Sequence, residues 1–251
     1  MEHQDLPEHP YLILTLRRTG GTSLTTFLSE VSSFATKEHE PFNPDRVWGG
    51  ITEEFKRTKN VDLLRSKLGE ALQSRPNIKH CIEVVPGVLT QELITACHER
   101  QYRLMLLTRR DETSRLISLF LAQSTGAWGP DEARQIYRNI MAGQTKPNPI
   151  QLHEVKQRYL LDAGILGQTL SVLRYKEIPY KWLVFEELYK GQTPIETQAI
   201  EIAKYLGLRI EAEDPNLATF SNQPGQNSKV IEPYVPGIAE ARDILSREVV
   251  A

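Results

Sequence analysis

The stretch RRTGGTSL, residues 17–24, determines how the start of this chain folds, because of what precedes and follows it. It comes directly after residues 11–16, an apolar run whose composition predicts a buried strand. It leads into residues 24–31, where apolar side chains recur at helical spacing. The sequence therefore predicts a strand, a tight turn with two glycines, and the start of a helix.

This turn has the composition of a phosphate cradle. Backbone N–H groups at the start of a helix lack intrahelical partners, and the helix dipole favours an anion there. Glycines let the backbone approach the anion, hydroxyl groups donate hydrogen bonds to it, and an arginine adds permanent charge. The residues expected to bind the anion are Arg18, Thr19, Gly20, Gly21, Thr22 and Ser23. The alternative interpretation is a plain turn in which Thr22 caps the helix.

Composition and length suggest a single α/β domain. The 251 residues are expected to form one domain, with a core over about 11–208 and a polar C-terminal loop and tail over 209–251. The formal net charge of −2 gives no electrostatic reason to expect nucleic acid or an anionic membrane. The two cysteines, Cys81 and Cys97, lie in apolar segments and are expected to be buried thiols. Neither a transmembrane run nor a signal peptide is recognisable, which favours the cytoplasm.

Apolar runs alternate with helical patterns along the chain, which predicts a P-loop-like parallel β-sheet flanked by helices, with additional helical segments. Further strands are predicted at residues 78–85, 102–108 and 180–185. Helices are predicted at residues 52–74, 89–100, 112–122 and 195–206, with a helical region over 131–173 that is interrupted near 146–149. The tail after Leu208 is predicted to be mostly ordered loop.

A second group of polar residues follows the strand predicted at 102–108. Arg109, Arg110 and Asp111 come directly after it, and Ser118 lies eight residues beyond Arg110. Because ligands bind at the carboxyl ends of parallel strands, this group predicts a second anion site. One ligand with two phosphate-like groups would account for both sites. The alternative is a solvated strand end in which Asp111 caps the next helix, and we assign Arg115 and Arg134 to the surface.

Four segments, in order over residues 11–208, resemble the PAPS-dependent sulfotransferases, whose donor is 3′-phosphoadenosine 5′-phosphosulfate (PAPS). RRTGGTSL resembles their 5′-phosphosulfate loop, and RRDETSRLIS, residues 109–118, is similar to their 3′-phosphate motif. LVFEEL, followed by a helix that ends in YLGL, resembles a segment that closes many of these folds. EPFN near residue 40, IKH at 78–80 and AQSTGAW at 122–128 are most similar to the bacterial carbohydrate branch, which includes trehalose sulfotransferase.

The resemblance implies an enzyme that moves a sulfuryl group from PAPS to a hydroxyl of a carbohydrate, glycolipid or small-molecule acceptor. The product is adenosine 3′,5′-bisphosphate (PAP), and no metal is required. Arg18 would stabilise charge on the leaving phosphate, while Arg110 and Ser118 would bind the 3′-phosphate. A C-terminal loop with a basic residue would close over that phosphate, and the expected residues are Gln226, Ser228 and Lys229. The alternative for these three is a solvated tail.

Two residues compete for the role of the base that takes the acceptor's proton. Glu40 resembles the acidic residue that faces the acceptor in the carbohydrate branch, and His80 resembles the histidine of the cytosolic branch. Their alternatives are an exposed loop acid and a hydrogen-bonded strand histidine. A histidine is the better default base at neutral pH, but Pro41 and Pro44 are expected to fix the Glu40 loop, so we rank Glu40 first.

The chain also departs from the family. Most animal members of the cytosolic branch have Lys where this chain has Arg18 and an aromatic residue where it has Ser23, so the adenine contact must come from elsewhere. Trp48 is expected to stack on a sugar or adenine or to pack, and the resemblance places Trp128 at the acceptor pocket. Two other classes stay open. A P-loop kinase or NTPase is disfavoured by the missing GK[ST] lysine, whereas a non-catalytic PAP-binding module is compatible with the sequence.

Overall fold

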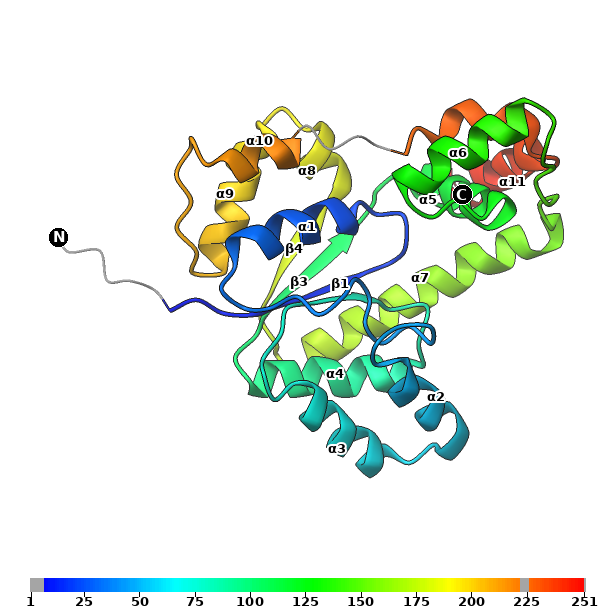
Figure 1. Cartoon of the computed structure of the whole chain (residues 1–251). Coiled ribbons are helices and arrows are strands. Elements are labelled where there is room, and N and C mark those ends of the chain that lie inside the picture. The colour runs from blue at the N-terminus through cyan, green and yellow to red at the C-terminus, as the bar shows by residue number, and fades with distance from the viewer. Residues whose placement is uncertain (1–6, 222–225, 251) are drawn as a thin grey trace. The chain divides into compact units, whose positions relative to one another are not determined.

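The computed structural model describes residues 7–221 and 226–250, and these residues form an α/β fold on one parallel sheet (Figure 1). Its strands are β1 (Tyr11–Thr15), β2 (Ile78–Cys81), β3 (Arg103–Thr108) and β4 (Tyr180–Val184). Their order is β2-β1-β3-β4, and every neighbouring pair is parallel. The prediction of a parallel α/β sheet flanked by helices is confirmed, and β1 lies inside it with a partner on each side.

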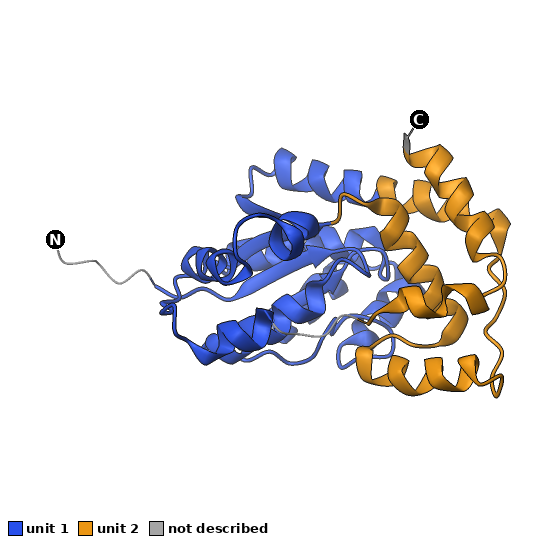
Figure 2. Ribbon diagram, turned by 90° about the horizontal axis from the view of Figure 1, so that it is seen from above, with its two compact units in different colours: residues 1–108, 165–222 blue, residues 109–164, 223–251 orange. Residues whose placement is uncertain are grey.

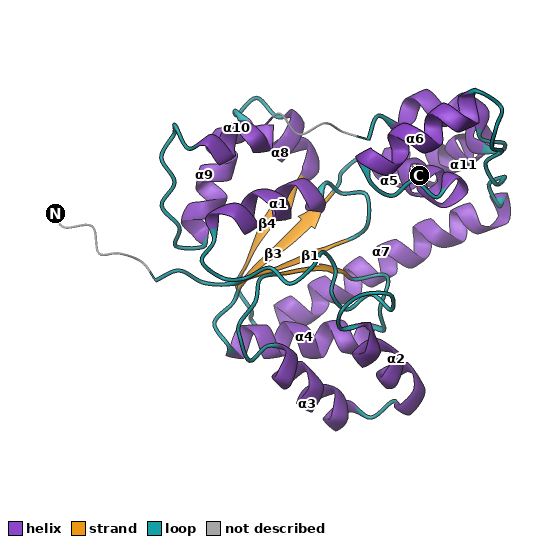
Figure 3. Ribbon diagram, in the orientation of Figure 1, coloured by secondary structure: helices purple, strands orange, loops and turns teal. Residues whose placement is uncertain are grey.

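Helices cover both faces of this sheet because β1 is apolar on both faces (Figure 1, Figure 3). Tyr11 and Ile13 belong to the core on one face, and Leu12 and Leu14 to the core on the other. The first face is covered by α1 (Gly21–Val31), α8 (Phe185–Lys190), α9 (Ile195–Tyr205) and α10 (Pro215–Ser221). The second is covered by α2 (Gly49–Thr58), α3 (Val61–Ala71), α4 (Gly87–Glu99) and the last part of α7 (Leu152–Tyr175).

The chain divides into two compact units, and each is built from two stretches of sequence (Figure 2). The sheet belongs to the first unit, residues 1–108 and 165–222. The second unit, residues 109–164 and 223–251, packs α5 (Glu112–Thr125), α6 (Pro130–Met141), the first part of α7, η1 (Ser228–Tyr234) and α11 (Ile238–Val250) around its own apolar core. Among the described helices, none is long and apolar enough to cross a bilayer.

Several predicted elements differ from the structure for local reasons. The strand expected over 78–85 ends at Cys81, and a turn follows. The single helix expected over 52–74 is two helices, because Lys59 adopts a left-handed φ of 54° and Asn60 caps α3 by accepting the N–H of Leu63 at 3.0 Å. The tail expected as loop is largely helical, in α10, η1 and α11.

Arg115 was expected on the surface, and this is wrong. Its side chain is fully buried in the second unit, where the guanidinium contacts Asp162 at 2.6 Å and Glu112 at 2.8 Å. Asp162 is itself 1% exposed and also contacts Arg158 at 2.8 Å. A buried charge is tolerated only when it is paired, and this network pairs Arg115 of α5 with Asp162 of α7. Arg134 is exposed, as expected.

Arg115→Met should destabilise the second unit by about 3–5 kcal/mol, because it leaves the buried Asp162 with one fewer cationic partner. Urea unfolding followed by circular dichroism measures the change. Arg134→Met is the matched control, because it makes the same substitution in the exposed ion pair of Arg134 with Asp131. It should change the free energy of unfolding by no more than about 0.5 kcal/mol. Adding Asp162→Leu to Arg115→Met should recover part of the loss, since both buried charges are then gone. A neutral effect of Arg115→Met would contradict this role.

Candidate functional site

The loop after β1 is a tight turn that joins a strand to a helix, as the sequence predicted. Arg18 adopts a left-handed φ of 68° and Gly20 one of 80°, and α1 begins at Gly21 with Gly20 as its N-cap. A Cβ atom at Gly20 would lie 2.7 Å from Cε2 of Tyr189 and 2.9 Å from Cδ2 of Phe185. Glycine is therefore required at position 20 by the backbone angle and by the close approach of α8.

Three contacts hold this loop in place. The Tyr189 hydroxyl donates to the carbonyl of Gly20 at 2.7 Å. The Thr19 hydroxyl donates to the carbonyl of Leu16 at 2.6 Å and also contacts the Thr15 hydroxyl. The backbone N–H and the Nε of Arg17 both donate to the Glu83 carboxylate, at 2.9 and 3.0 Å. Thr19 was expected to bind the anion, but its side chain is buried and its hydroxyl supports the loop from within.

The remaining predicted residues of the loop are more accessible. Thr22 is exposed, and Ser23 and Arg18 are half-buried. Because these three surround the start of α1, their hydroxyl and guanidinium groups are the loop side chains that an anion could reach. Arg18 lies two residues before Gly20, the N-cap of the helix, and its binding of an anion stays a prediction.

Lys79 is a charged group near this loop that the sequence analysis missed. It lies in the middle of β2 and is 3% exposed, yet its ammonium donates to the Thr22 hydroxyl at 3.0 Å. The same ammonium lies 2.9 Å from Oε1 of Glu40. The signal that could have revealed it is the lysine itself, because a charge inside a strand predicted to be buried needs a partner.

Glu40 lies beside the loop in a constrained backbone conformation, with a φ of 58°. Its Oε2 accepts a hydrogen bond from Nδ2 of Asn43 at 2.7 Å, and its Oε1 pairs with Lys79. Burial by itself would raise the pKa of Glu40, but the charge of Lys79 and hydrogen bonds from Lys79, Cys81 and Asn43 lower this pKa to about 2. Glu40 is therefore a fixed, ionised carboxylate, and its exposed-acid alternative does not describe it.

His80 points to the opposite side of β2 from Lys79. Its Nε2 lies 3.0 Å from the Thr90 hydroxyl on α4, and the ring of Phe42 meets it edge-on at 6.0 Å. Burial lowers the pKa of His80 to about 4, although the charge of Glu40 opposes this, so the imidazole is neutral at pH 7. These contacts are those of its alternative, the hydrogen-bonded strand histidine.

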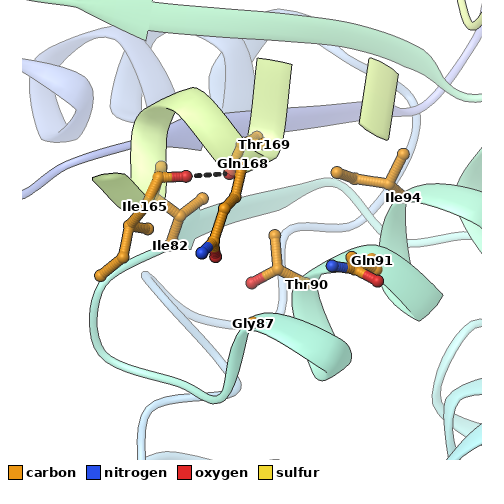
Figure 4. A pocket seen from close by; sticks show the side chains of 8 residues that line it. All are labelled: Ile82, Gly87, Thr90, Gln91, Ile94, Ile165, Gln168 and Thr169. Carbon is orange, nitrogen blue, oxygen red and sulfur yellow. Dashed lines mark hydrogen bonds between the residues drawn. The ribbon is translucent and has the colours of Figure 1, made fainter. Parts of the chain in front are cut away.

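A small pocket lies beside Thr90, the hydrogen-bond partner of His80. Thr90, the partner of His80, faces it from α4, and Gln168 and Thr169 face it from the last part of α7 (Figure 4). Ile82 and Ile165 close its sides, so the pocket offers a few polar groups in apolar walls. It lies on the face of the sheet that α4 covers, whereas the loop after β1 leads into α1 on the other face.

The other predicted site residues belong to the second unit. Arg110 follows β3 and Ser118 is half-buried on α5, while the Asp111 carboxylate caps α5 by accepting the N–H of Ser114 at 2.8 Å. The amide of Gln226 donates to the carbonyl of Ala127 at 2.7 Å. Ser228 is half-buried and Lys229 is exposed, both on η1, and Trp128 is also exposed. Residues 222–225 of the polar segment lie outside the described part of the chain.

Trp48 belongs to the first unit and packs. Its ring lies 5.0 Å from that of Phe42, at the edge of the core that covers the second face of the sheet. This agrees with the packing alternative for Trp48 and gives no indication that it stacks on a ligand.

A scan against protein-family models finds no match to this chain. A search of curated proteins finds no significant match either. The residues and contacts described above are therefore what a functional assignment must be built on.

Proposed function

We propose that this protein is a PAPS-dependent sulfotransferase with a P-loop-like sulfate-donor loop at residues 17–24. It transfers a sulfuryl group to a hydroxyl of a carbohydrate, glycolipid or small-molecule acceptor, in the manner of the bacterial carbohydrate branch. The support comes from the ordered resemblance of the sequence and from the geometry around the loop.

One observation carries this proposal. The Glu40 carboxylate and the Thr22 hydroxyl share a single ammonium group, that of Lys79, at 2.9 and 3.0 Å. The residue ranked first as the base thus lies next to the loop expected to bind an anion, although 17 residues lie between Thr22 and Glu40 in the sequence. A transferase needs this closeness, because it must hold the donor group and the acceptor hydroxyl together.

The roles of the residues follow from their positions. Sulfuryl transfer resembles phosphoryl transfer in that negative charge grows on the leaving phosphate during the reaction. Arg18, Thr22 and the first N–H groups of α1 would stabilise that charge. Glu40 would accept the proton of the acceptor hydroxyl. Its low pKa makes it a weak base while it is paired with Lys79, so the pairing must loosen before it acts.

A nucleoside-phosphate kinase is a second candidate, and Lys79 is the observation that favours it. The sequence argued against a kinase because no lysine follows the glycines of the loop. The ammonium of Lys79 reaches the same helix start from a neighbouring strand and weakens that argument. A non-catalytic module that binds PAP is the third candidate, and it would leave Glu40 without a chemical role.

PAP should stabilise the protein more than AMP or ATP with Mg²⁺, because the 3′-phosphate assigned to Arg110 and Ser118 is present only in PAP. A ligand at one hundred times its dissociation constant adds about 2.7 kcal/mol of stability, which a thermal-shift assay resolves. Arg110→Ala should remove the advantage of PAP over AMP, whereas Arg134→Ala should keep it. Equal shifts for AMP and PAP would exclude the 3′-phosphate site, and a larger shift with ATP and Mg²⁺ would favour the kinase.

Glu40→Gln should lower kcat by about 10²–10⁴-fold without weakening PAP binding, because it preserves the shape of the side chain but removes the base. His80→Asn is the matched test of the competitor and should reduce kcat far less, since His80 points away from the loop. Sulfate transfer from PAPS to a panel of sugar and lipid hydroxyls measures both. A nearly normal Glu40→Gln with an inactive His80→Asn would reverse the ranking. Tight PAP binding without transfer to any acceptor would favour the binding module.

A further inference from the structure

Lys79 occupies a position that packing alone does not explain. Its neighbours along β2, Ile78 and His80, contribute to the core on the α4 side, while Lys79 is directed to α1. Burying an ammonium is costly unless it is paired, and an apolar side chain could fill the same place without that cost. A charge kept here therefore indicates a role at the start of α1.

The loop is shaped to admit this lysine. A Cβ atom at Gly21 would lie 3.1 Å from Cδ of Lys79, which is tighter than ordinary van der Waals contact. The second glycine of the loop thus makes room for the lysine chain, in addition to any approach of a ligand. The side chain of Lys79 passes the first residue of α1, and its ammonium contacts Thr22 in the first turn of that helix, where the N–H groups attract an anion.

The partners of Lys79 leave it able to bind a ligand. An ammonium has three N–H donors, and among the described residues it finds two acceptors, Thr22 and Glu40. If the ammonium of Lys79 moves away, the Glu40 carboxylate still accepts the hydrogen bond from Asn43. The ion pair can therefore open without stripping the carboxylate of every partner.

We propose that Lys79 supplies the ammonium that binds the phosphate or sulfate group in the loop, and that Glu40 is the counter-ion that holds Lys79 in place until that anion arrives. The assignment rests on the proposed function in so far as it takes the loop as an anion site. A bound dianion attracts the ammonium more strongly than one carboxylate does, so it draws Lys79 from Glu40. Donor binding thereby frees the carboxylate at the moment when an acceptor hydroxyl needs a base.

The test is a double-mutant cycle on ligand affinity, measured by isothermal titration with PAP and, separately, with inorganic pyrophosphate. Lys79→Met should weaken binding of both ligands about ten- to a hundredfold, the value of one charge-assisted contact. Glu40→Gln should tighten binding about tenfold when Lys79 is present, and clearly less in the Lys79→Met background. Lys67→Met removes an exposed lysine that pairs with Glu70 at 3.2 Å and should leave both affinities unchanged.

Thermal unfolding of each variant accompanies the titrations, because Lys79→Met leaves Glu40 without its cation. The double variant Lys79→Met/Glu40→Gln removes both charges and stays informative if the single variant fails to fold. The affinity of the double variant for PAP and for pyrophosphate should be that of a loop without an ammonium, and therefore lower than the affinity of the wild type. An affinity of the double variant equal to that of the wild type would overturn the proposal, as would an equal effect of Glu40→Gln in both backgrounds.

The two ligands separate this inference from the proposed function. If PAP binds and Lys79→Met leaves its affinity unchanged, the role of Lys79 is refuted and the sulfotransferase proposal stands. If PAP fails to bind but pyrophosphate binds in a Lys79-dependent way, the role of Lys79 stands and the sulfotransferase proposal falls. If neither ligand binds the wild-type protein, both are refuted.

Discussion

The pairing of β1 with β2 on one side and β3 on the other is the constraint on which the first unit depends. All five residues of β1 are buried, and its backbone is hydrogen-bonded to both neighbours. Because a neighbouring strand occupies each edge of β1, the chain continues out of the sheet at the carboxyl end of β1. There it turns sharply into α1. In this strand order, a ligand crevice is expected beside β1 at that end. The loop with Gly20 and the lysine from β2 meet there for this reason.

Much of this unit was predictable because its signals are local. Apolar runs and helical periodicity located all four strands and most helices of the sheet layer to within a few residues, and the two glycines located the turn. The break between α2 and α3 was missed because Asn60 acts as a cap only once Lys59 takes a left-handed angle, and a charged stretch gives no sign of that. The helix α11 was missed because proline and polar residues before it dominate the composition of the tail.

The least predictable features are contacts between residues far apart in the sequence. An arginine in a polar stretch suggests a surface charge, and the buried partner that pairs with Arg115, Asp162, lies 47 residues further along the chain. Lys79 and His80 are adjacent in the sequence, yet the alternation of a strand sends one to α1 and the other to α4. From the sequence, Glu40 and His80 were two candidates for the base of one site, with Glu40 ranked first. The alternation of β2 separates them, because Glu40 pairs with Lys79 on one side of the strand, whereas His80 faces Thr90 on the other.

The second unit has a consequence for how the protein is made. Its core needs α5 and α6, which a ribosome produces early, and also Ile231, Ile238 and Leu245, which follow the end of α6 at Met141 by 90 residues or more. Domains generally fold as units during synthesis. The core around Leu116 and Phe120 therefore stays incomplete while β4 and the helices that follow it are still being translated. This core is complete only when η1 and α11 have been made, and its apolar side chains are exposed to other molecules for that interval of synthesis.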